Sequence, residues 1–87
     1  MIRQTLKQQP GKFYLCKRTR YVMQFYQESG TFDVGTPEQE KYLAWTRYIQ
    51  FARSFKTVKG ARAMARLLLE NYGEATMIVD QSGKVVE

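Results

Sequence analysis

The first clear hydrophobic pattern in the chain is typical of a β-hairpin. From residue 12 to residue 27, large aromatic and aliphatic side chains form two arms, and a polar cluster at residues 17–20 separates them. Two such arms joined by a polar turn predict a pair of antiparallel strands. A second hairpin is predicted near the end of the sequence, where residues 75–79 and 84–86 flank a turn at residues 80–83. Gly83 suits the left-handed position of that turn.

The segment between the hairpins begins with turn-forming residues. Residues 28–35 predict a connecting loop in which Phe32 is the one side chain large and apolar enough to anchor the chain. Thr36, Pro37 and Glu38 then have the features of a helix start, with a hydroxyl cap, a proline at the first helical position and an acid in the first turn. Residues 46–55 fit a helix face but are also rich in strand formers. We expect this first helix to continue to about Ser54.

A second helix is predicted from residue 58 to residue 72. Thr57 can cap its start, and Gly73 can adopt the left-handed conformation that ends many helices. At about 100° per residue, one side of this helix is apolar and another is basic. The apolar side contains Val58, Ala61, Ala65, Leu68, Leu69 and Tyr72, with Met64 beside it, and the basic side contains Lys59, Arg62 and Arg66.

The order of elements is therefore strand, strand, helix, helix, strand, strand. Two hairpins can share one antiparallel sheet, and two helices on one face would bury its apolar side, so the expected fold class is α+β. The 87 residues, with a mass of 10.2 kDa, are enough for one small domain. We expect a flexible N-terminal tail over residues 1–10 and a single α+β domain over residues 11–87.

The second half of the chain resembles small open reading frames of bacteriophages and mobile elements. The likeness rests on residues 52–57 leading into a helix with Ala61 and Leu68, followed by residues 75–80 and 83–86. It covers roughly the last forty residues. The resemblance implies a bacterial or phage context and a cytoplasmic location, and it brings no shared activity or catalytic residues.

Charge adds a candidate function to this picture. The chain has 14 lysines and arginines, 8 aspartates and glutamates, and a net charge of +6. Residues 1–27 and 47–66 contain no acid, so the predicted hairpin and second helix together could present a positive surface to backbone phosphates. Four aromatic side chains in the first hairpin, Tyr14, Tyr21, Phe25 and Tyr26, offer stacking surfaces for unpaired bases. The predicted contacts to nucleic acid, or to a nucleic-acid complex, are Lys17, Arg18, Arg20, Lys59, Arg62 and Arg66.

Two other interpretations of the same residues stay open. The cations can be a solvated helix face and a solubilising turn, and the aromatic side chains can be core packing. Alternatively, Trp45, Tyr48 and Phe51 form an aromatic patch flanked by Arg47 and Arg53, which is typical of a protein interface. The chain would then be a homodimer, a protein-interaction module or a phage-type inhibitor.

The residues that are missing argue against catalysis. The chain has no histidine and one cysteine, so it cannot form a Ser-His or Cys-His couple, a disulfide of its own or a thiolate zinc site. Cys16 falls in a predicted strand, where we expect a buried, inert thiol. The scattered glycines form no phosphate-binding motif. No apolar run has the length of a membrane span or a signal peptide. We therefore expect a soluble, non-enzymatic protein without metal or cofactor.

Overall fold

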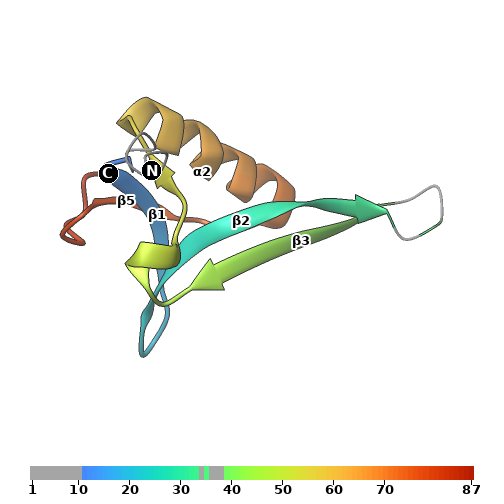
Figure 1. Ribbon diagram of the computed structural model, residues 1–87, viewed down its shortest axis with the longest axis horizontal. Coiled ribbons are helices and arrows are strands. Elements are labelled where there is room, and N and C mark those ends of the chain that lie inside the picture. Colours follow the sequence, from blue (N-terminus) through green and yellow to red (C-terminus); the bar gives the residue numbers. More distant parts are fainter. Residues whose placement is uncertain (1–10, 34, 36–38) are drawn as a thin grey trace, which may run out of the picture.

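The computed structural model describes residues 11–33, 35 and 39–87, and the predicted tail at residues 1–10 lies outside this part of the chain. The described part has one sheet and one long helix, which agrees with the α+β class (Figure 1). The elements in chain order are β1 (Phe13–Arg18), β2 (Met23–Asp33), β3 (Gln39–Thr46), a 3-10 turn η1 (Ile49–Phe51), β4 (Ser54–Phe55), α2 (Val58–Tyr72) and β5 (Met77–Asp80).

Strand β1 is the centre of the antiparallel sheet and has partners along both edges. On one edge, its second half pairs with β2, and its first two residues, Phe13 and Tyr14, pair with β4. On the other edge, residues 13–16 pair with β5. Strands β2 and β3 form a long ribbon that extends away from the rest of the sheet (Figure 1). Most of the packed core is therefore built around the short strand β1.

Helix α2 covers one face of the sheet and has the bounds that the sequence predicts. The Thr57 hydroxyl accepts a hydrogen bond from the Gly60 N–H at 3.0 Å. At the other end Gly73 has φ of 69°, and its N–H donates to the carbonyls of Leu68 and Leu69. Ala61 and Leu68 are fully buried against the sheet. They pack with Leu15, Tyr26 and Ile78 in the helix-side core.

A second cluster of buried residues fills the opposite face. Because side chains alternate along a strand, Cys16 points away from the helix that its neighbour Leu15 contacts. Tyr14, Cys16, Phe25 and Val79 are buried there, and we call this cluster the far-side core. Its cover includes Ile49 and Ala52, at and just after η1.

The predicted first helix is wrong. The segment forms β3, η1 and β4 instead, and the predicted loop at residues 28–35 is largely a continuation of β2. Leu43 and Trp45 explain the difference, because residues two apart lie on different sides of a helix but on one face of a strand. Both pack against the helix-side core. The predicted helix start at residues 36–38 lies outside the described residues.

The predicted second hairpin is confirmed in position, with a shorter returning arm. Asp80 and Lys84 are joined by a hydrogen bond from the Asp80 N–H to the Lys84 carbonyl at 2.9 Å, and Gly83 has φ of 86°. Val85 forms a single bridge to Val79. The chain after the turn therefore covers the outer edge of β5 without adding a regular strand.

Gly11 fixes the start of β1 by close approach to the chain around β4. Its N–H donates to the Ser54 hydroxyl at 2.8 Å. A Cβ atom at Gly11 would lie 2.4 Å from the Phe55 carbonyl carbon. A larger residue would therefore push the two backbones apart, and only glycine fits this contact.

Candidate nucleic-acid interface

The turn between β1 and β2 presents exposed cations and an exposed ring. Arg18 and Arg20 are exposed, and Tyr21 is 85% accessible to solvent. The turn is held by Thr19, whose N–H and hydroxyl both donate to the Val22 carbonyl, at 2.8 and 2.9 Å. Residues 18–23 also line a shallow hollow of about 170 Å³. The tip is thus a defined turn, and its polar and aromatic side chains point outward.

Strand β3 ends near the start of β2, and the turn η1 follows it in the chain. Thr46 is opposite Phe25 in the sheet, and Met23, two residues before Phe25, is opposite Arg18. The chain that follows Thr46 then forms η1, on the side of the sheet away from α2 (Figure 1). We call the exposed residues at this end the tip-end surface. They are Arg18, Arg20, Tyr21, Arg47, Tyr48 and Phe51.

Two rings of the tip-end surface form a pair. The Tyr48 and Phe51 ring centroids are 6.0 Å apart, with an angle of 81° between the planes. Their side chains are 57% and 61% exposed, so burial in the core does not account for the pair. Ile49, between them, packs on the far-side core. The turn therefore packs one partly buried side chain on the core as an anchor and leaves two rings in solvent.

Lys17 and Trp45 belong to the helix side of the sheet. The Lys17 Nζ atom lies 3.4 Å from Glu74 Oε1 and 4.2 Å from the centre of the Trp45 ring. Trp45 packs edge-on against Tyr26 in the helix-side core. The structure thus separates Trp45 from Tyr48 and Phe51, with which the sequence grouped it, and it gives Lys17 an intramolecular partner.

The helix cations lie away from the tip. Lys59, Arg62 and Arg66 are exposed on α2, while the β1–β2 turn is at the far end of the sheet (Figure 1). Arg62 donates two hydrogen bonds to the Glu87 carboxylate. This contact lowers the pKa of Glu87 and raises the pKa of Arg62. The six predicted cations therefore divide into a tip group and a helix group.

Most of the aromatic side chains proposed for stacking have structural roles. Tyr14, Phe25 and Tyr26 are buried in the two cores, and Tyr21 alone of the four is exposed. Arg47, which the sequence placed beside an aromatic patch, is exposed just after the end of β3. The position of Arg47 in the fold depends on the register between β2 and β3. Neither segment's sequence indicates that register by itself.

The remaining reactive groups have structural surroundings. Cys16 is fully buried, as expected, and burial raises the pKa of its thiol, an effect that the charge of Arg18 opposes. The described residues contain no group of three or more metal-ligating side chains. No helix in the described ranges is long and apolar enough to cross a membrane.

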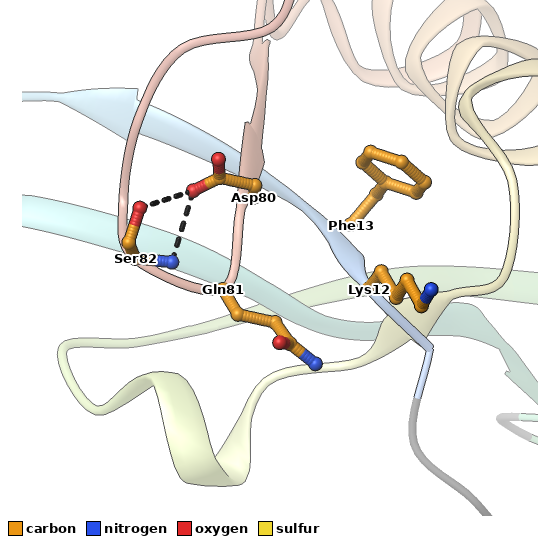
Figure 2. A pocket seen from close by; sticks show the side chains of 5 residues that line it. All are labelled: Lys12, Phe13, Asp80, Gln81 and Ser82. Atoms are coloured by element: carbon orange, nitrogen blue, oxygen red, sulfur yellow. Dashed lines mark hydrogen bonds between the residues drawn. The ribbon is translucent and has the colours of Figure 1, made fainter.

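A hollow of about 350 Å³ beside the second hairpin contains a carboxylate that is already bonded within its own turn. Figure 2 shows Asp80 turned toward Ser82, with Lys12 and Phe13 on the other side of the hollow. Asp80 Oδ1 accepts hydrogen bonds from the Ser82 N–H, the Ser82 hydroxyl and the Lys84 N–H, at 2.9, 2.7 and 3.0 Å. These bonds, that of the Ser82 hydroxyl first, lower the pKa of Asp80. The Asp80 carboxylate therefore stabilises the turn that follows β5.

No protein-family model, curated protein or solved structure matches this chain. The function of the tip-end surface is therefore inferred from its own residues. It combines three arginines with three exposed rings, and within the described part of the chain none of these arginines forms an ion pair.

Proposed function

We propose that the protein is a non-enzymatic binding protein that contacts single-stranded nucleic acid through the tip-end surface. The observation that supports this is the exposure of Arg18, Arg20 and Arg47 and of the Tyr48 and Phe51 rings, around the end of β2 at which β3 also ends. Arginine binds phosphate oxygens through two parallel hydrogen bonds. Exposed rings stack on bases that have no pairing partner, and this contributes about 1–3 kcal/mol per base.

This proposal narrows the set of cations that the sequence suggested. Lys17 is bonded to Glu74 and Arg62 to Glu87, so both already have an acidic partner. Lys59 and Arg66 lie on the helix, apart from the exposed rings. Arg18 and Arg20 from the predicted set, together with Arg47, are the cations placed to bind phosphates next to a stacked base.

The decisive test compares two variants with the same change in net charge. Arg18→Gln with Arg20→Gln changes the tip, and Lys59→Gln with Arg66→Gln changes exposed positions on α2. Anisotropy of a labelled single strand is titrated with each protein at several salt concentrations. The tip variant should bind more weakly, and its slope of log K against log salt should be less steep by about 1.4. The helix variant should stay close to the wild type.

Equal losses in the two variants would contradict the proposal, because they would show that only the overall positive charge matters. Phe51→Ala supplies the second readout without a change in charge. It should weaken binding to the single strand by about 1–3 kcal/mol and leave binding to a duplex unchanged. If Phe51→Ala weakened binding to the single strand and to the duplex equally, the proposed stacking of Phe51 on an unpaired base would be wrong.

The Tyr48–Phe51 pair also favours a second candidate function, binding of a protein partner or of a second copy of the chain. Exposed aromatic side chains next to arginine are typical of the energetic centre of an interface. Sedimentation equilibrium tests self-association directly. A concentration-dependent dimer that Tyr48→Ala converts to a monomer, without loss of folded structure, would support this alternative over nucleic acid.

A further inference from the structure

A groove on the helix side of the sheet is separate from the tip-end surface. It has a volume of about 360 Å³ and lies between α2 and the β2–β3 ribbon. The register of the ribbon shifts between Tyr26 and Glu28, beside this groove. The Tyr26 carbonyl, at the shift, accepts a hydrogen bond from the Arg53 N–H at 3.0 Å. This hydrogen bond holds the chain after η1 at the wall of the groove.

The floor and one wall of the groove are apolar or already hydrogen-bonded. Met64 and Leu67 line it from α2. The Tyr72 hydroxyl donates to the Gly30 carbonyl at 3.2 Å, and the hydroxyls of Tyr26 and Ser29 are 2.8 Å apart. The first contact connects the helix to the ribbon, and the second lies within β2. A ligand entering the groove would meet side chains whose positions are already fixed, as in most small-molecule sites.

The charged groups that line the groove are all positive. Lys41 contributes an ammonium group, which lies 3.4 Å from the Asn71 carbonyl and 5.9 Å from the centre of the Tyr72 ring. Arg53 also lines the groove, and among the described residues its guanidinium has no ion-pair partner. None of the described residues that line the groove is acidic. An apolar floor with two cations complements an anion that carries a flat apolar group.

We propose that this groove binds a small organic anion, with its ring on Met64 and Leu67 and its phosphate or carboxylate between Arg53 and Lys41. The guanidinium supplies the bidentate hydrogen bonds that either anionic group accepts. The volume is near the lower end of the range for small-molecule sites, which begins at about 300 Å³. The groove and the tip-end surface lie on opposite sides of the sheet, so this site is independent of the proposed nucleic-acid contact.

The test is an NMR titration of the full chain with phenyl phosphate, benzoate and inorganic phosphate in turn. Phenyl phosphate should shift the backbone amides of Gly30, Arg53 and Asn71 and leave those of the β1–β2 turn unchanged. Inorganic phosphate should bind more weakly than phenyl phosphate because it has no ring. Comparison of phenyl phosphate with benzoate then shows which anionic group the cations prefer.

Variants with a matched charge change locate the site. Arg53→Gln should weaken phenyl phosphate binding about tenfold or more, because a charge-assisted hydrogen bond is lost. Arg66→Gln removes one positive charge elsewhere on the surface and should leave the affinity unchanged. The combined Arg18→Gln and Arg20→Gln variant should also retain phenyl phosphate binding, even if it loses nucleic acid. Equal weakening by Arg53→Gln and Arg66→Gln, or shifts centred on the β1–β2 turn, would overturn the proposal.

Discussion

Leu15 and Cys16 are neighbours in β1 and both are fully buried, but they face different coverings. Leu15 packs under α2, a fifteen-residue helix with its own cap at each end. Cys16 packs in a core whose cover includes the region of η1, a turn of three residues. The helix side therefore has a cover specified largely by local sequence. The far side depends on β3 and β4, which hold η1 from either end.

The difference between the two coverings decides which side chains stay exposed. Helix α2 packs most of its predicted apolar side on the core and leaves Leu69 exposed, whereas the three-residue turn η1 packs Ile49 on the far-side core. Ile49 anchors the turn, and Tyr48 and Phe51 remain exposed. The thinner covering of the far side is thus the reason that two aromatic rings stay exposed there. The same segment also positions Arg53 at the groove on the other side.

The largest expected effect is loss of a buried leucine on the helix side. Leu68→Ala should lower the free energy of unfolding by about 2–5 kcal/mol, because it leaves a cavity under α2. Its neighbour Leu69, 54% exposed, is the matched control, and Leu69→Ala should change stability by less than about 1 kcal/mol. Urea denaturation followed by circular dichroism measures both. Equal losses would contradict the assignment of Leu68 to the core.

The same contrast explains how far the helix side and the far side of the sheet could be predicted from the sequence. The bounds of α2 were predictable because Thr57, the apolar stripe and Gly73 all lie within one short segment. The first hairpin was predictable for the same reason, but its turn lies at residues 19–22 and not at 17–20, because Lys17 and Arg18 pair with β2 as part of β1. The segment around β3 was not predictable, because its apolar residues fit both the helical and the strand period. The residues that decide between the two lie in β2, for example Gly30 opposite Tyr42.

The candidate site was predictable in composition but not in arrangement. The exposed Arg18 and Arg20 follow from the polar turn of a hairpin, which local sequence indicates. Their separation from Arg62 and Arg66 follows from the position of the helix on the sheet, which no local pattern contains. Likewise Trp45 and Tyr48 are three residues apart in a predicted helix, and the strand that actually forms directs Trp45 to the helix-side core.

A smaller effect is expected from truncating the anchor of the far side. Ile49→Ala should lower the free energy of unfolding by about 1–2 kcal/mol, less than Leu68→Ala, because Ile49 is only partly buried. It should also weaken binding at the tip-end surface, since Tyr48 and Phe51 would lose their common support. Urea denaturation and the anisotropy titration measure the two effects. If Ile49→Ala destabilised the protein as much as Leu68→Ala, then η1 would contribute as much as α2 to the free energy of unfolding.

The smallest effect concerns the outer edge of β5, where polar contacts rather than an apolar layer hold the chain. Asp80 binds its own turn, and Glu87 binds Arg62. Both carboxylates have a lowered pKa in the folded protein. A lowered pKa means that the ionised form stabilises the fold. This contribution is complete above the unfolded-state pKa of about 4 and is lost as the pH falls through the folded-state value.

Asp80→Asn should therefore reduce stability most at neutral pH. The difference from the wild type should shrink as the pH falls from about 5 toward 3, because the wild-type carboxyl then also becomes neutral. Urea denaturation across this range measures the two curves, and a difference that stays constant with pH would contradict the role of the charge. Ser82→Ala isolates the cause, since the Ser82 hydroxyl makes the strongest contribution. It should raise the pKa of Asp80 toward its usual value in an NMR titration while the helix-side core stays intact.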